Sequence, residues 1–263
     1  MHAIFCGMKR SFVSSVFLLA LYMANGGASA QDSSAQSAGL NGDIGMAVYS
    51  QNGVIQGNPR STQVLPYAYF DYDRFFARID TFGIKTIPLG SGHLELVGRY
   101  SQDNLTPKGY PYSLLSPKET PLPIGLGTFQ LTPLGAFFLY VFDDITASKG
   151  GKIAEFTYAA QIDLPLAVHV YPLIGFDYKD KTYLNYLYGI TALESQRTGL
   201  PVYSANSGVS AFAAMMIEVP LSKSLVLNTY FNQKWLATTI ANSPMVTNRR
   251  VDNIFISINR HFE

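Results

Sequence analysis

The chain has 263 residues, of which 48% are hydrophobic, 13% aromatic and 14% charged, with a formal net charge of +1. Typical soluble domains have about 25% charged residues, so this composition disfavours an ordinary soluble protein, and the near-neutral balance argues against a nucleic-acid-binding chain. Beyond the N-terminal segment, no stretch offers the roughly 18 consecutive apolar residues of a membrane helix. Two classes remain: a membrane β-barrel, or a secreted β-sandwich or soluble barrel.

The N-terminal segment has the pattern of a secretory signal peptide. Lys9 and Arg10 form its positive region, Phe12–Ala24 is the apolar stretch, and Ala28–Ala30 is an A-x-A-like cleavage site. We therefore predict that residues 1–30 are removed on export. Loss of two basic residues and no acidic ones changes the formal net charge from +1 to −1.

Cleavage also removes Cys6, the single cysteine, so the exported chain has no thiol for a disulfide. Met8 is an alternative start to Met1, because it directly precedes the two basic residues. Residues 31–41 are rich in Ser, Ala and Gln without an apolar period, which predicts a disordered leader before a barrel at residues 42–263.

Within residues 42–263, segments of about ten residues alternate between apolar and polar side chains. Successive side chains of a strand point to opposite faces, so each segment has one apolar and one wet face. In the last segment, isoleucines at 254, 256 and 258 share one face, and Ser257, Asn259 and His261 share the other. The wet faces include charges, which does not suit the dry interior of a sandwich. The clearest segments are Lys152–Asp163, Leu166–Tyr178, Leu225–Trp235 and Val251–Phe262.

Tight and long connections alternate in the C-terminal half, as in barrels with short periplasmic turns and longer outer loops. The tight connections are Thr132-Pro133, Leu164-Pro165 and Pro220–Ser222, and the long ones are residues 51–63, 103–124, 145–151, 179–206 and 237–250. We predict an all-β, antiparallel, up-and-down transmembrane β-barrel in the outer membrane. An even strand number places both chain ends in the periplasm. Twelve strands follow if Val64–Asp71, Arg74–Ile79 and Phe82–Pro88 are three short strands, and ten is the alternative.

The long connection at residues 179–206 carries a family resemblance. Its Tyr, Gly and Pro pattern resembles the signature loop of the MipA/OmpV outer-membrane protein family, also called the MltA-interacting protein family. The matching residues are Tyr183, Tyr186, Tyr188-Gly189-Ile190, Ser195, Gly199-Leu200-Pro201, Tyr203 and Gly208. Further matches are Val64–Tyr67, Asp71-Tyr72, Arg74–Ala77 and Asn242–Pro244. The chain departs from the family at uncharged Thr238–Ala241, and near Arg99 and Asp103 where the family has a fuller charged cluster.

The resemblance implies a non-enzymatic, monomeric outer-membrane barrel in contact with outer-membrane lipid and lipopolysaccharide. It also implies a scaffold role that joins a murein transglycosylase to a murein synthase, or a role in cell-surface contact. A small-solute channel and a barrel hydrolase are the alternatives. Bilayer conductance would favour the channel, and hydrolysis of lipid or peptide would favour the enzyme.

The tyrosines of the long loop suggest a second hypothesis. Tyr183, Tyr186, Tyr188 and Tyr203 lie outside the predicted strands, where rigid amphipathic rings make good contact surfaces. We expect the loop to fold over or into the barrel mouth, as a plug or as a contact surface, with bends at Gly189 and Gly199. Deletion of Tyr186–Tyr203 is expected to raise small-solute permeability if the loop is a plug.

The wet strand faces contain the remaining candidate residues. We predict that His93, Glu95, Arg99 and His169 face the lumen as fillers. The sequence has no compact Ser-His-Asp motif, no G-x-S-x-G motif and no zinc-ligand spacing, so we predict no catalytic, metal or cofactor site. Large side chains expected to narrow the lumen are Phe137, Phe212, Met216, Tyr230 and Arg99.

Overall fold

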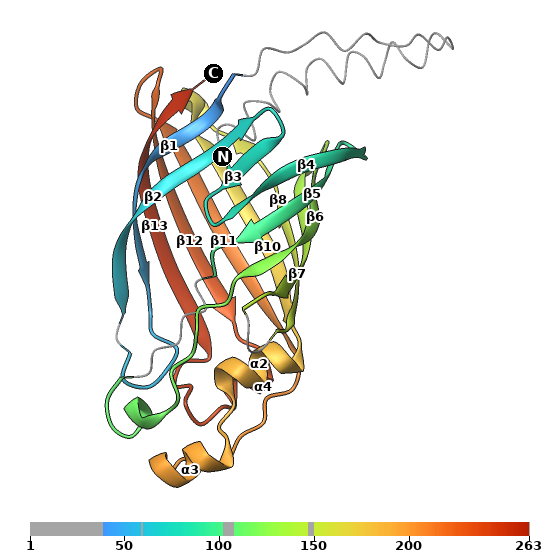
Figure 1. Cartoon of the computed structure of the whole chain (residues 1–263). Coiled ribbons are helices and arrows are strands. Elements are labelled where there is room, and N and C mark those ends of the chain that lie inside the picture. Colours follow the sequence, from blue (N-terminus) through green and yellow to red (C-terminus); the bar gives the residue numbers. More distant parts are fainter. Residues whose placement is uncertain (1–38, 59, 102–107, 147–149, 263) are drawn as a thin grey trace.

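The computed structural model describes residues 39–58, 60–101, 108–146 and 150–262 (Figure 1). The predicted signal peptide and most of the predicted leader lie outside the described residues, as does Asp103. The strands are β1 Asn41–Gln51, β2 Ser61–Tyr72, β3 Phe75–Arg78, β4 Thr81–Leu89, β5 Gly92–Arg99, β6 Pro123–Thr132, β7 Gly135–Asp144, β8 Lys152–Ala159, β9 Ile162–Asp163, β10 His169–Lys179, β11 Gly208–Pro220, β12 Leu225–Trp235 and β13 Arg250–Phe262. The helices are η1 Tyr112–Leu114, η2 Pro165–Ala167, α2 Lys181–Tyr188, α3 Ala192–Thr198 and α4 Thr238–Ala241.

The strands form one closed antiparallel barrel. Neighbours in the chain pair with each other, β1 pairs with β13, and β10 pairs with both β8 and β11, which closes the sheet. The two-residue β9 continues β8, because both pair with successive parts of β10. Counted as one, β8 and β9 bring the barrel wall to twelve strands in the described part of the chain. This confirms the prediction of twelve, including the three short strands now seen as β2, β3 and β4.

Side-chain alternation builds the wall. On β13, Ile254, Ile256 and Ile258 are exposed on the outer surface, whereas Phe255, Ser257 and Asn259 are buried on the inner one. An apolar outer band with a polar interior is the arrangement of an outer-membrane barrel, and a closed sheet leaves no unpaired edge in lipid. Among the described residues, no helix is both long and apolar enough to cross a membrane.

The two ends of the barrel differ. The ends of the described chain meet at one rim, where Gly42 pairs with Phe262 and the turns are short, including Asp73-Arg74, Gly90-Ser91 and Pro133-Leu134. We assign this rim to the periplasm. The opposite rim has the long connections and all three α-helices of the described chain (Figure 1).

The wall is shorter on the side of β3. This strand has four residues and pairs with only Tyr69–Tyr72 of β2. Among the described strands, Ser61–Tyr67 of β2 pair with β1 alone. Pro66 lies in this stretch, and because proline has no N–H to donate, it suits a strand without a second partner. The described part of the connection between β5 and β6 that contains η1 lies at the outer rim (Figure 1).

One lumen assignment was wrong. Phe137 lies on the outer face of β7, with its ring centroid 6.3 Å from that of Phe156, while Phe138 and Tyr140 take the inner face. The segment of β7 from Ala136 to Phe142 is apolar or aromatic on both faces, so alternation did not reveal which parity faces inward.

Candidate functional site

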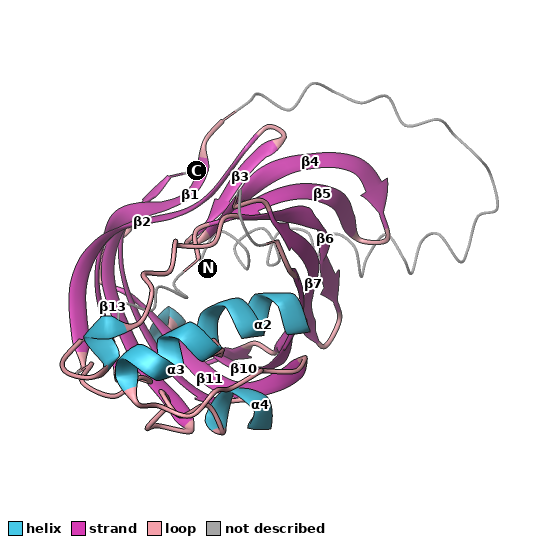
Figure 2. Cartoon of the chain, turned by 60° about the horizontal axis from the view of Figure 1, so that its bottom comes forward, coloured by secondary structure: helices cyan, strands magenta, loops and turns pink. Residues whose placement is uncertain are grey.

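Helix α2 lies across the outer mouth of the barrel (Figure 2). It begins at the N-cap Asp180, whose carboxylate accepts a hydrogen bond from the Tyr183 N–H at 2.8 Å. Tyr183, Leu184 and Leu187 fall on one helical stripe, and each has 0% exposed surface. Figure 2 shows α2 and α3 lying across the ring of strands.

The buried stripe of α2 packs on side chains from the barrel wall. The cluster, here called the outer cluster, joins α2 to inward-facing residues of β3, β5, β7 and β8 and to the neighbouring loops. Its members are Ile55, Phe76, Val97, Leu115, Tyr140, Phe142, Ile153, Tyr183, Leu184, Leu187, Tyr188, Ala205, Ala237, Ile240 and Met245. Burial of so many apolar side chains stabilises α2 in the mouth, at about 1.5–3 kcal/mol for each large side chain.

The loop tyrosines bind neighbouring segments instead of pointing into solvent. The Tyr186 hydroxyl accepts a hydrogen bond from the Glu119 N–H at 2.6 Å, and the Tyr203 hydroxyl donates to the Thr239 carbonyl at 2.6 Å. The Tyr188 carbonyl accepts from the Ser243 hydroxyl at 2.7 Å. These hydrogen bonds join the long loop to the segment before β6 and to the connection between β12 and β13.

The two loop glycines are required for different reasons. Gly199 ends α3 with a φ of 73°, a left-handed conformation that glycine adopts without strain. Gly189 has a φ of −74°, which any residue adopts, but a Cβ there would lie 2.3 Å from the Asn185 carbonyl oxygen. The bend at Gly189 therefore depends on close approach and not on conformational freedom.

A buried carboxylate fixes α3 to the segment after η1. Glu194 accepts hydrogen bonds from the Thr191 N–H at 2.9 Å and from the Ser116 N–H at 3.1 Å, and the Lys118 ammonium lies 3.5 Å away. With the Thr191 hydroxyl, these contacts complete a capping box. Burial opposes ionisation of this carboxyl, but the hydrogen bonds and the lysine outweigh it and lower the pKa of Glu194 to about 2.

We expect acid to release α3 from its neighbours. The pKa of Glu194 in the folded chain is about 2, below the ordinary value of 4.5, so the stabilisation is complete above pH 4.5 and is lost as the pH falls towards 2. The free energy that holds α3 against the segment after η1 is expected to fall by on the order of 3 kcal/mol. Amide exchange of the peptide containing α3, corrected for intrinsic rates, measures it. Glu194→Gln is expected to exchange faster at neutral pH and to show little further acceleration in acid; equal acceleration in both proteins would contradict this assignment.

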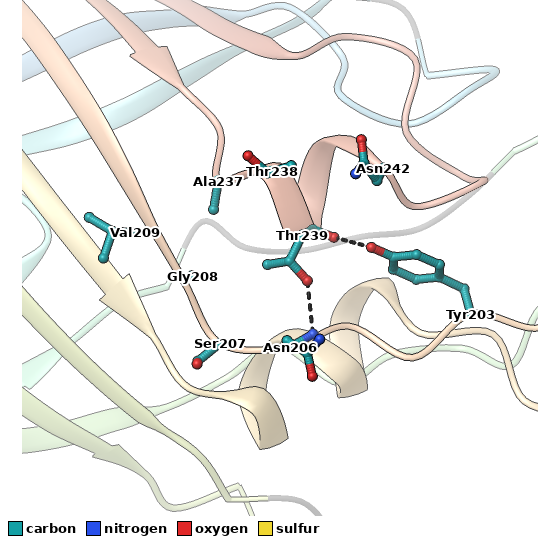
Figure 3. A pocket seen from close by; sticks show the side chains of 9 residues that line it. All are labelled: Tyr203, Asn206, Ser207, Gly208, Val209, Ala237, Thr238, Thr239 and Asn242. Carbon is teal, nitrogen blue, oxygen red and sulfur yellow. Dashed lines mark hydrogen bonds between the residues drawn. The ribbon is translucent and has the colours of Figure 1, made fainter.

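A cavity of about 460 Å³ lies between two outer loops (Figure 3). Beside the Tyr203 bond, the Asn206 N–H donates to the Thr239 hydroxyl oxygen at 2.8 Å, so the two loops are joined at this point. The lining is uncharged and consists of Tyr203, Asn206, Ser207, Gly208, Val209, Ala237, Thr238, Thr239 and Asn242. Such a lining can hydrogen-bond an uncharged polar group and offers no acid or base.

An ion-pair network lies on the inner faces of β3, β5 and β7, on one side of the barrel. Arg78 donates from both terminal nitrogens to Glu95, each at 2.8 Å, and also to the Tyr140 hydroxyl at 2.8 Å. The Tyr140 hydroxyl in turn donates to Glu95 at 2.9 Å. The guanidinium lies 4.0 Å above the Phe76 ring, so it is held by both charge and π contact. This bidentate pair is nearly inaccessible to solvent.

The other predicted lumen residues lie on inner faces but do not form one site. Arg99 contacts Glu155 and donates to the Thr81 hydroxyl at 3.1 Å. His93 shares the inner face of β5 with Glu95. His169 lies on another wall, where its Nδ1 is 2.5 Å from the Asp163 carboxylate.

Arg78 was not predicted as the partner of Glu95. Arg78 follows Phe76 by two residues and so shares its inward parity, which was the available signal. No group of three or more His, Cys, Asp or Glu side chains suited to a metal ion occurs among the described residues.

The profile of the family described as MltA-interacting protein MipA matches residues 44–262. The chain belongs to the MipA family. The match covers the barrel from β1 to β13, and the closed wall with its apolar outer band places this MipA-family chain in the outer membrane. The family resemblance inferred from the loop residues is thereby confirmed.

Two relatives of this MipA-family chain are the proteins named "Putative outer membrane protein YiaT" of Escherichia coli strains K12 and O157:H7. Each is 21% identical over 206 residues, covering 77% of this chain and 83% of theirs. Among solved structures, Pseudomonas putida OprB aligns with 84% of this chain and 94% of its own, at 7% identity and a TM-score of 0.28. The outer-membrane protein OprG of Pseudomonas aeruginosa aligns with 86% and 94%, at 9% identity and a TM-score of 0.22.

Proposed function

We propose that the chain is a non-conducting interaction protein of the outer membrane that acts as a scaffold for murein-processing enzymes. The observation that carries the first part is the filled lumen. Helix α2 covers the outer mouth, and the buried Arg78–Glu95 pair occupies the interior beside the wall formed by β3 and β5. A diffusion channel needs an open aqueous path, which this arrangement does not favour.

A second buried cluster supports the same conclusion. It lies on the inner faces of strands on both sides of the barrel and is here called the inner cluster. Its members are Ala47, Tyr67, Tyr69, Ala159, Tyr171, Leu173, Met216 and Phe255. Aromatic side chains at this level narrow the lumen a second time.

The partner class comes from the family. The family name, MltA-interacting protein, supports a murein transglycosylase as partner, and murein-processing enzymes work on the periplasmic side. The described periplasmic turns are short, but some present exposed side chains, including Leu134 at 81% exposure. We therefore assign the contact to these turns and propose no catalytic step for the barrel itself.

Site-specific cross-linking in intact cells tests the scaffold role. Because Cys6 is the single cysteine and belongs to the predicted signal peptide, single cysteines can be introduced as attachment points for a photo-cross-linker. Leu134→Cys and Lys223→Cys lie on periplasmic turns, and Ser204→Cys lies in the outer loop as the matched control. We expect murein transglycosylase or synthase to be captured from the two turn positions and not from the control.

Conductance of the wild-type protein in a planar bilayer tests the alternative function, a small-solute channel. Capture of no murein enzyme from either turn, together with stable single-channel conductance of the wild type, would support the small-solute channel in place of the scaffold. Hydrolysis of lipid or peptide by the refolded protein would instead support the other alternative, a barrel hydrolase.

A further inference from the structure

Polar side chains converge inside the barrel near its periplasmic end. On neighbouring strands, His169 lies opposite Glu218, and Glu218 lies opposite Asn228. Asp43 lies opposite His261 where β1 meets β13. Glu218, Asn228 and Asp43 have no exposed surface, so the group belongs to the lumen and not to the outer wall.

The group is dominated by acidic and acceptor atoms. The Asp43 carboxylate is 2.9 Å from the Nδ1 of His261, and the Asp163 carboxylate is 2.5 Å from the Nδ1 of His169. Asp43 and Glu218 both lie within electrostatic range of the Tyr67 hydroxyl. The side chain of Asp163 is 55% exposed, which connects the group to solvent at the rim.

Two buried amide oxygens in the group lack a hydrogen-bond donor. The Nδ2 of Asn228 donates to the Tyr67 hydroxyl at 3.4 Å, and the Nδ2 of Asn259 donates to the Ser257 hydroxyl at 2.9 Å. The Oδ1 atoms of both asparagines are buried without a partner. Because buried acceptors are normally satisfied, these two oxygens indicate a donor supplied from outside the described chain.

We propose that this end of the lumen binds a linear organic polyammonium cation. Each primary ammonium has three N–H donors and a positive charge, which suit amide oxygens beside the Asp43 and Glu218 carboxylates. An anion would be repelled by the same carboxylates. A metal ion is disfavoured because no metal-ligand group occurs among the described residues. The site does not depend on the proposed scaffold role, since it lies inside the barrel and not on the turns.

Titration calorimetry with spermidine and the refolded, signal-free protein in detergent micelles tests the site. We expect saturable binding to the wild type. Glu218→Gln removes one charge at nearly constant shape. It is expected to weaken binding about tenfold, because that is the typical effect of losing one charge-assisted hydrogen bond. Asp73→Asn is the matched control, because Asp73 is exposed on the periplasmic turn after β2 and asparagine tolerates its φ of 51°. The control is expected to bind as the wild type does.

Asp43→Asn provides a second variant should Glu218→Gln fail to give the heat-modifiable band of a folded barrel, and it is also expected to weaken binding. Absence of saturable binding to the wild type would overturn the proposal whatever the variants do. Equal weakening by Asp73→Asn and Glu218→Gln would also overturn it, because general surface attraction would then explain the binding.

Discussion

Arg78→Met is expected to destabilise the barrel by about 3–5 kcal/mol, the range for removing one partner of a buried ion pair. The substitution keeps an apolar stem against Phe76 but removes both hydrogen bonds to Glu95. Glu95 then remains a buried carboxylate with the Tyr140 hydroxyl as its remaining partner in the network. Urea unfolding in micelles, followed by the fluorescence of Trp235, the single tryptophan, measures the change.

A double-mutant cycle measures the interaction energy between Arg78 and Glu95 apart from the contacts that each makes with other residues. Arg78→Met with Glu95→Met is expected to recover most of the lost stability, because no charge is then left without its partner. The exposed pair between Lys152 and Asp143 is the control, and Lys152→Ala is expected to change little. If the single and the double variant lose the same stability, the network does not behave as a coupled pair.

The wall of the barrel was predictable because lipid imposes a period of two. Isoleucines at 254, 256 and 258 lie on one face of β13, and Ser257 and Asn259 lie on the other. This pattern predicted both the strand and the face that it turns outward. The prediction was wrong at Phe137. There β7 is apolar on both faces, so the alternation of side chains does not distinguish the inner face from the outer one. Residues that face a packed lumen and residues that face lipid are then chemically alike.

The helices of the outer loop were not predicted, although their signals were present. Asp180 precedes an apolar stripe at Tyr183, Leu184 and Leu187, and Thr191 with Glu194 forms a capping box. Short helices are marginal alone, and α2 is stable because the barrel mouth buries its stripe. Such tertiary stabilisation cannot be deduced from local sequence.

The partners of the charged residues inside the barrel could not be predicted from the sequence either. Glu95 and Arg78 are 17 residues apart, and Asp43 and His261 are 218 apart. Alternation places each of them on the inner face, but the partner depends on strand order and shear around the barrel. His93, Glu95, Arg99 and His169 were therefore predicted as lumen fillers without their partners.

Opening the lumen is expected to require two separate changes, because two barriers lie in series. We expect no single-channel steps from the wild type in a planar bilayer. Replacing residues 182–204 by a short Gly-Ser linker removes most of α2 and all of α3 but leaves the inner cluster. This deletion alone is therefore expected to give little or no conductance, whereas the sequence, which did not reveal the inner cluster, predicted raised permeability for a plug. Tyr171→Ala with Phe255→Ala trims the inner cluster but leaves α2 in the mouth, and is likewise expected to stay closed.

The deletion combined with both alanine substitutions is expected to give clear single-channel steps, because each barrier then lacks its large side chains. The heat-modifiable band of each variant serves as the folding control. Steps from the deletion alone that match those of the combined variant would place the whole barrier in the outer loop, and the inner cluster would then have no part in closing the lumen. Steps from the wild type would contradict the filled lumen itself, since buried aromatic rings and a buried ion pair cannot line a stable aqueous path without rearrangement.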